Sequence, residues 1–311
     1  SAAAQHRVLV CAGTGCLVNG SLKVYEAFVK ALKESGLNAI VELKKEEEGV
    51  FVSRTGCQGF CQIGPLVTVL PENIFYTKVK PGDVAEIVET TIRKGDVVER
   101  LLYVEPDSQR VCRTKDEIPF YRKQHRFALS NCGAIDPESV EEYIASGGYR
   151  QAIRAYLEMS PEDICQLIFA AGLRGRGGGG FPTGRKWDVA RRETNAKKYV
   201  ICNGDEGDPG AFMDMGIMEG NPHSVIEGMT IAARAIEADE GFIYVRAEYP
   251  LAVKRLRKAI DDAYRTGLLG KNLFGSEYSF NLNIMEGAGA FVCGEETALI
   301  ASIEGKRGMP S

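Results

Sequence analysis

Apolar residues in the first hundred positions alternate between short strand-like runs and longer segments with helical spacing. Residues 7–11 (RVLVC) form a short apolar run, and a helical pattern over residues 22–32 follows Ser21, which can cap a helix. Gly36 then ends the predicted helix. Further strands are predicted at residues 38–43, 50–53, 66–70 and 75–79, and a second helix at residues 82–94. The order β-α-β-β-β-β-α indicates a compact layered module.

The second half of the chain alternates helical and strand-like patterns. Ser160 can cap a helix that begins with proline and two acidic residues and that ends at Gly172. Strands are predicted at residues 198–202, 242–246 and 280–285, and further helices at residues 224–236, 251–264 and 295–303. This alternation is typical of a Rossmann-like α/β domain.

A change in composition separates the two halves. From about Pro106 the charge density rises and the periodicity weakens, as in residues 112–124 (CRTKDEIPFYRKQ). We therefore predict a first domain over residues 1–105, a linker or wrapping arm over residues 106–150, and an α/β domain over residues 151–311. The length of 311 residues agrees with two domains at about 150 residues each.

Composition excludes several protein classes. The formal net charge is −4, with 44% hydrophobic and 26% charged residues, which is close to the average for soluble globular proteins. Disordered, collagen-like and coiled-coil chains are disfavoured, and nothing suggests a basic surface for nucleic acid. No apolar run approaches the roughly 18 residues of a membrane span, and no signal-peptide core is present. We expect a cytoplasmic protein, in which nine cysteines indicate metal or redox chemistry more than disulfides.

Four of the cysteines form two closely spaced pairs. Cys11 and Cys16 have four residues between them, and Cys57 and Cys61 have three. Both pairs lie in glycine-rich loops, TGCLVNG and TGCQGFC, where backbone can approach a small inorganic core. Four thiolates in two unequal pairs suit a [2Fe–2S] cluster. Zinc, which more often takes C-x2-C pairs, and four unrelated buried cysteines are the alternatives.

A glycine-rich segment occupies residues 172–184 (GLRGRGGGGFPTG). It contains G-x-G-x-x-G, but a predicted helix precedes it, so the dinucleotide fingerprint fails because that motif requires a strand. A phosphate-binding Walker A loop also fails, since Arg185 stands where the lysine is required. Backbone without side chains, flanked by cationic residues such as Lys186, can still lie against a planar ligand that bears phosphate. Phe181 offers a stacking face; a flexible surface loop is the alternative.

Two further loops follow predicted strands. Residues 203–210 (NGDEGDPG) place an amide and three carboxylates beyond the carboxyl end of a strand, where α/β sheets bind ligands. An EF-hand calcium loop is out of register here, so these groups are expected to accept hydrogen bonds from a ligand, or to form a solvated turn. Residues 287–297 (GAGAFVCGEET) open a helix that can bind an anion, although Glu295 or Glu296 can equally complement the helix dipole.

Taken in order, GLRGRGGGGFPTGRKW, CNGDEGDPGAF and GAGAFVCGEETALIASIEG resemble the flavin-binding NADH dehydrogenase subunit of complex I and its relatives in NAD(P)-linked [FeFe] hydrogenases and formate dehydrogenases. The first hundred residues resemble the thioredoxin-like [2Fe–2S] ferredoxin module of the same assemblies. A ferredoxin module fused ahead of the flavin domain is more similar to the hydrogenase β subunit. The family continues beyond residue 311, so we expect a chain that is incomplete at its C-terminus and [4Fe–4S] clusters in the missing part.

The resemblance implies a set of cofactor ligands. The cluster ligands would be Cys11, Cys16, Cys57 and Cys61. The FMN contacts would be Gly175, Gly177, Gly178, Lys186, Asn203, Asp205, Gly294 and Glu295. The nicotinamide nucleotide would face Phe181, Glu206, Asp208 and Glu296, and Phe291 is a further cofactor-binding candidate. Glu206, Asp208 and Glu296 would position the hydride transfer, with no side chain acting as acid or base. Val189 stands where the family has a second aromatic residue near Trp187.

The implied function is electron exchange between NAD(P)H and iron–sulfur clusters. NAD(P)H gives hydride whereas clusters take one electron at a time, so a flavin must stand between them. The resemblance implies a hydrogenase catalytic α subunit and a small [2Fe–2S] γ subunit as partners, with ferredoxin as a further candidate and electron bifurcation left open. The same module could serve a quinone-reducing or formate-oxidising enzyme. A non-enzymatic alternative is an electron carrier or assembly scaffold without flavin.

Overall fold

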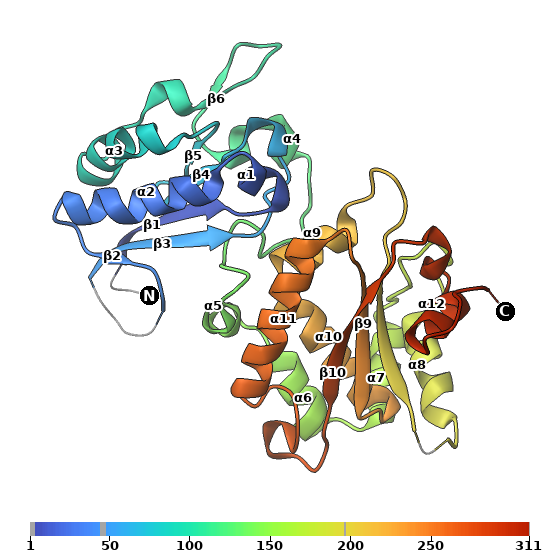
Figure 1. The fold of residues 1–311 in the computed structure, drawn as a ribbon. Coiled ribbons are helices and arrows are strands. Elements are labelled where there is room, and N and C mark those ends of the chain that lie inside the picture. The colour runs from blue at the N-terminus through green and yellow to red at the C-terminus, as the bar shows by residue number, and fades with distance from the viewer. Residues whose placement is uncertain (1–3, 44–47, 196, 311) are drawn as a thin grey trace. The chain divides into compact units, whose positions relative to one another are not determined.

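A computed structural model describes residues 4–43, 48–195 and 197–310 of the chain. The chain forms two compact units (Figure 1). The first comprises residues 1–142 and 219–221, and the second residues 143–218 and 222–311, apart from the residues outside the described ranges. The predicted domain limits at residues 1 and 311 fall outside the described residues.

The first unit is built on a five-stranded mixed sheet in the order β2-β3-β1-β4-β5. Its central strand β1 pairs in parallel with β3 and antiparallel with β4. The strands are β1 (Ala4–Cys11), β2 (Ala39–Ile40), β3 (Gly49–Thr55), β4 (Val67–Leu70) and β5 (Ile74–Tyr76). The helices are α1 (Thr14–Val18), α2 (Ser21–Glu34) and α3 (Val84–Ile87), which continues as a π-helical turn, Val88–Arg93. All five predicted strands and both predicted helices of this module are present.

The apolar stripe of α2 explains why that helix packs on the sheet. Val24, Phe28 and Leu32 recur at helical spacing and are fully buried. They join Val8 and Val10 of β1 in one hydrophobic cluster. Burial of such side chains stabilises a fold by about 1.5–3 kcal/mol each, so the strand that ends in Cys11 is held firmly.

The segment predicted as a linker or wrapping arm, residues 106–150, has short elements of its own. It contains β7 (Val111–Cys112), which forms a hairpin with β6 (Tyr103–Val104), and helix α4 (Pro119–Arg122). Ile118 and Tyr121 pack in a cluster with Cys11 and Cys16. The first unit therefore extends to Glu142 and not to residue 105, because short apolar stretches inside the charged sequence cover the cysteine loops.

The second unit contains a three-stranded parallel sheet in the order β10-β9-β8. Its strands are β8 (Tyr199–Gly204), β9 (Glu240–Arg246) and β10 (Asn281–Gly287). The helices are α5 (Val140–Ala145), which crosses the boundary, α6 (Arg150–Glu158), α7 (Pro161–Ala170), α8 (Thr183–Arg192), α9 (Met213–Gly220), α10 (Pro222–Ile236), α11 (Pro250–Arg265) and α12 (Glu296–Ile303). The predicted α/β architecture is confirmed, with α5, α6, α8 and α9 as additional helices.

Helices cover both faces of this sheet (Figure 1). Helices α10 and α11 pack on one face. On the other, Leu299 of α12 packs with Tyr244 of β9 and Cys293. Because the strands are parallel, their carboxyl ends and the loops that follow lie at one edge. Among the described residues, no helix has the length and hydrophobicity needed to cross a membrane.

Candidate cofactor sites

The four paired cysteines lie on loops that the first unit's central strands bring together. Cys11 ends β1 and Cys16 lies in α1, whereas Cys57 follows β3 and Cys61 begins a 3-10 turn, Cys61–Ile63. Cys11 and Cys16 are buried, and Cys61 is exposed. Since β1 and β3 are parallel neighbours, the two loops leave the same edge of the sheet. The fold thus brings together two cysteine pairs that are about 40 residues apart in sequence.

The thiols lie within reach of one another. The Sγ atoms of Cys57 and Cys61 are 3.7 Å apart, and the N–H of Gly59 donates to Cys57 Sγ at 3.3 Å. Hydrogen bonding with Cys16 and burial raise the pKa of Cys11 to about 12, and burial raises the pKa of Cys61 to about 11. Ligation by Cys11 and Cys61 would therefore release protons, whereas hydrogen bonding with Cys11 lowers the pKa of Cys16. Among the described residues, no three metal-ligating side chains are placed around a single ion position.

A carboxylate holds the loop between Cys11 and Cys16. The backbone N–H and the hydroxyl of Thr14 donate to the two carboxylate oxygens of Glu219, at 3.2 and 2.5 Å. Glu219 is buried and belongs to the same compact unit as the cysteines. Sequence reasoning missed this residue, because it is more than two hundred positions from Thr14 and lies in no recognisable motif. A negative charge is thereby fixed beside the cysteine loops.

In the second unit, the glycine-rich segment forms the turn between α7 and α8. Gly175 N–H donates to Phe181 O at 2.9 Å, which closes the loop at its base. Above that base, Gly178 and Gly180 have positive φ angles of 104° and 59°, and a Cβ on either would meet no atom within 4 Å. Gly177 also faces open space. The loop presents bare backbone to a space that a flat ligand could fill.

The acidic turn after β8 is anchored to the loop after β10. Asn203 Nδ2 donates to Gly294 O at 2.8 Å, and its Oδ1 accepts from the N–H of Asp205 at 3.1 Å. Phe291 packs on Gly207 so closely that a Cβ there would lie 2.7 Å from the phenyl ring. These contacts bring the two predicted loops together at the carboxyl edge of the sheet.

Helix α8 joins the same constellation. Lys186 Nζ lies 3.0 Å from Glu296 at the start of α12, with both side chains largely exposed. This ion pair links the glycine-rich segment to the last loop. The three motifs predicted to form one site therefore lie together within one unit.

The carboxylate of Asp205 is the chemically incomplete group of this site. Both of its oxygen atoms are buried, and neither has a hydrogen-bond partner among the described residues. Burial raises the pKa of Asp205, and the nearby Arg246 opposes that shift. An unpartnered buried carboxylate costs free energy unless a ligand supplies donors. Such a carboxylate fits a ligand that carries N–H groups, as a flavin does.

Two predicted ligands have structural partners instead. Glu206 is buried and accepts hydrogen bonds from the N–H groups of Met213, Asp214 and Met215, so it caps α9. Glu295 caps α12 by accepting from the N–H groups of Thr297 and Ala298. The hydroxyl of Thr297 also donates to it, and this hydrogen bond, followed by those from the two N–H groups, lowers the pKa of Glu295. Glu295 therefore lies where the alternative interpretation expected it, at the start of a helix whose dipole it complements. Their roles toward FMN and nicotinamide stay predictions.

Apart from the buried Glu206, the residues predicted to face the nicotinamide nucleotide, together with the further candidate Phe291, are the more open part of the site. Phe181 and Phe291 are 50% and 69% exposed. Asp208 is exposed on the acidic turn, and Glu296 is held by Lys186. Large exposed aromatic side chains beside a polar loop are suited to stacking on bases. The site thus combines a closed carboxylate region with an open aromatic rim.

Two residues, one that ends β9 and one shortly after it, support the acidic turn and were not predicted. Arg246 Nη1 and Tyr249 Oη both donate to Glu206 O, at 2.6 and 3.1 Å. Their position at the carboxyl end of a predicted strand was the one available signal. They fix the backbone that follows Asp205, so they orient its carboxylate indirectly.

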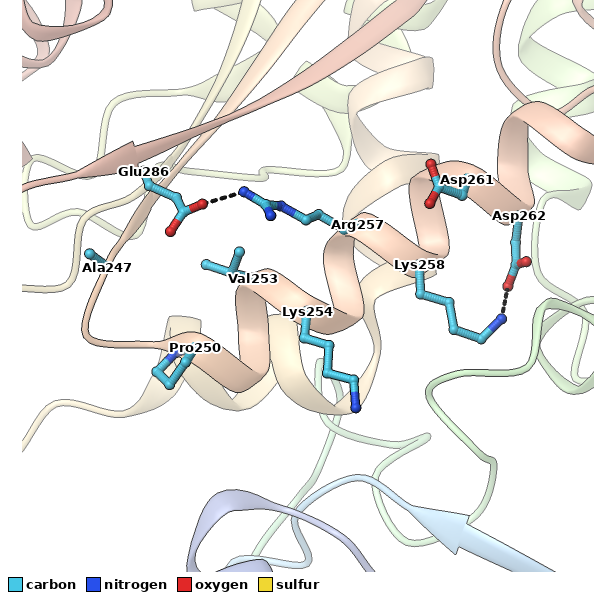
Figure 2. A pocket seen from close by; sticks show the side chains of 9 residues that line it. All are labelled: Ala247, Pro250, Val253, Lys254, Arg257, Lys258, Asp261, Asp262 and Glu286. Atoms are coloured by element: carbon cyan, nitrogen blue, oxygen red, sulfur yellow. Dashed lines mark hydrogen bonds and ion pairs between the residues drawn. The ribbon is translucent and has the colours of Figure 1, made fainter.

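A separate cavity of about 650 Å³ lies between α11 and the end of β10 (Figure 2). Its charged side chains neutralise one another: Arg257 pairs with Glu286, and Lys258 pairs with Asp262 at 2.8 Å. None of the predicted site residues lines it. It offers no net charge or orphaned group to a cofactor, and we assign it no role.

Comparison with protein families separates the chain into the same parts. Residues 168–311 match the family described as the Nuo51 FMN-binding domain, and residues 1–91 match the thioredoxin-like [2Fe–2S] ferredoxin family. The predictions of FMN, of a [2Fe–2S] cluster and of the two domain types are confirmed at this level.

Individual proteins are similar to this chain over part of their length. The NADP-reducing hydrogenase subunit HndC of Solidesulfovibrio fructosivorans is 57% identical over 61% of this chain and 38% of its own length. An NADH-quinone oxidoreductase subunit of Aquifex aeolicus is 51% identical over 55% of this chain and 40% of its own length. A crystal structure of an NAD+-reducing [NiFe]-hydrogenase aligns at TM-score 0.49 and 25% identity, over 99% of this chain and 47% of that one. The aligned region spans less than half the length of each relative.

Proposed function

We propose that this chain, which combines a thioredoxin-like [2Fe–2S] ferredoxin domain with an FMN-binding domain of the Nuo51 family, is the diaphorase part of a multisubunit oxidoreductase. It would exchange hydride with NAD(P)H at FMN and pass single electrons through iron–sulfur clusters. One observation carries the proposal: the carboxylate of Asp205, in a turn that Asn203 ties to Gly294, has buried oxygens that lack partners among the described residues.

The chain's own residues bind and orient, and none needs to move a proton. FMN, when bound, supplies the conversion of a two-electron hydride into single electrons. Asp205 would accept hydrogen bonds from ring N–H groups, and the backbone at Gly177 and Gly178 would lie against the ring system. Lys186 would balance phosphate charge. Phe181 and Phe291 would stack on the nucleotide and exclude water from it.

The cysteine loops would hold the cluster that takes the electrons onward. Cys11, Cys16, Cys57 and Cys61 supply four thiolates, which is the usual number for a [2Fe–2S] cluster. Free thiols at all nine cysteines suit a reducing compartment, and we place the protein in the cytoplasm.

Sequence identity to known relatives favours a hydrogenase as the enzyme that exchanges electrons with this chain. The relative named as an NADP-reducing hydrogenase subunit is 57% identical, against 51% and 45% for subunits of NADH-quinone oxidoreductase. We propose a hydrogenase catalytic subunit and a small [2Fe–2S] subunit as partners, and a quinone-reducing assembly as the second candidate.

Purified protein tests the proposal. Anaerobically prepared chain is titrated with FMN and then given NADH or NADPH with a one-electron dye. Bound FMN, close to one per chain, together with dye reduction that depends on NAD(P)H, supports the proposal. Cluster absorbance with neither FMN binding nor dye reduction would instead support an electron carrier without flavin.

A further inference from the structure

A basic groove of about 570 Å³ lies beside the cysteine loops in the first unit. Three short segments form it: the turn between α1 and α2, the loop after Cys61, and the segment after β5. Val18, at one wall, is 82% exposed, although it is a large apolar residue. Exposed apolar surface with a polar rim is typical of a site that another protein covers.

The charge of the groove has one sign. Lys23, Lys78 and Lys80 line it, all three are exposed, and no lining residue is acidic. No ion pair is formed by these lysines with the residues that the structure describes. Because the chain as a whole carries a net charge of −4, a local positive patch is not a by-product of composition. The groove is complementary to an acidic surface.

The floor of the groove is the backbone that contacts a cluster ligand. Gly64 lines the groove, and a Cβ on it would lie only 2.6 Å from Cys16 Sγ. The N–H of Lys78 donates to Ile63 O at 2.8 Å, which ties the basic segment to the same loop. A partner seated here would have little more than glycine backbone between itself and the thiolate of Cys16.

We propose that this groove is the docking surface for a small acidic protein that carries one electron at a time. In the exchange, one electron leaves the reduced cluster and enters the oxidised carrier, or the reverse, and no bond or proton moves. The inference rests on the proposed function only for the identity of the cluster, and it needs no flavin. The three lysines steer the carrier by long-range attraction, and Val18 provides the apolar contact.

Binding tests the groove separately from catalysis. The probe is an acidic plant-type [2Fe–2S] ferredoxin, titrated calorimetrically into the full chain at low and at raised salt. The double variant Lys23→Glu and Lys78→Glu is compared with Lys30→Glu and Lys33→Glu on α2, which makes the same change in net charge outside the groove lining. Iron content, visible absorbance and dye reduction are recorded for each preparation.

The proposal predicts that wild-type binding weakens as salt rises. The groove variant should bind at least about tenfold more weakly at low salt, and the control within about twofold of wild type. Equal affinity of wild type and groove variant, or an equal loss in the control, would overturn it. So would salt-sensitive self-association of the wild type in sedimentation that the groove variant abolishes, since a second copy would then be the occupant. Loss of dye reduction with retained ferredoxin binding would count against the proposed function alone.

Discussion

The two cofactor sites are built in opposite ways. In the first unit, Cys11 and Cys16 are part of a hydrophobic cluster, so two of the four proposed ligands are also core residues. In the second unit, the flavin loops are mostly exposed, and a few polar contacts such as Asn203 to Gly294 hold them. The cluster site is therefore coupled to the stability of its fold, whereas the flavin site leaves one buried carboxylate unpaired until a ligand arrives.

The largest expected effect is loss of the cluster without any change in FMN binding. Cys57→Ala removes a ligand that alanine cannot replace, so iron and sulfide of the [2Fe–2S] cluster should be lost while FMN affinity is unchanged. Iron analysis and FMN fluorescence titration measure the two. Cys112→Ala, a buried cysteine of the same core cluster, is the matched control and should retain iron. Full iron content in Cys57→Ala would remove Cys57 from the ligand set.

In the flavin site, a substitution that weakens FMN binding should stabilise the flavin-free protein. Burial raises the pKa of Asp205, so its ionised form costs stability at neutral pH in the absence of ligand. Asp205→Asn should weaken FMN binding about tenfold or more, because a neutral amide is a poorer acceptor. It should also raise the melting temperature of the flavin-free protein, because the uncompensated charge is removed. Lower stability together with unchanged FMN affinity would refute the assigned role.

The cluster site should respond to a carboxylate that is not a ligand. Glu219→Gln removes a negative charge beside Thr14 while one acceptor oxygen remains. The midpoint potential of the cluster should become more positive, since a nearby negative charge disfavours reduction. A redox titration followed by electron paramagnetic resonance measures it, with the exposed Glu26→Gln as charge-matched control. An unchanged potential at full iron content would show that Glu219 acts only in packing.

The smallest effect concerns the helix cap in the flavin site. Hydrogen bonds from Thr297 and Ala298 lower the pKa of Glu295. Its contribution to stability is then complete above its unfolded pKa of about 4.3 and is lost as the pH falls through the lower folded value. Glu295→Gln should flatten the acid limb of the curve of melting temperature against pH. The same curve for the variant and the wild type would exclude a stabilising cap.

The sequence was most informative where motif and periodicity coincide. Regular spacing in α2 and alternating patterns around β8, β9 and β10 predicted those elements, and loop position after a strand predicted that residues 203–210 would face a ligand. The packing of the segment after residue 105 was harder to predict, because Ile118 and Tyr121 are single apolar residues within charged sequence. Glu219 and Arg246 act through contacts distant in sequence, which periodicity does not record. Glu206 was expected at the nucleotide, and the structure shows its carboxylate used to cap α9.

The most direct measurement of the central claim is titration of flavin-free full chain with FMN, followed by flavin fluorescence, for the wild type and for Asp205→Asn. The account predicts saturation close to one FMN per chain in the wild type and affinity at least about tenfold lower in the variant. Failure of the wild type to bind FMN, or equal affinity in both, would contradict a flavin site built around that carboxylate.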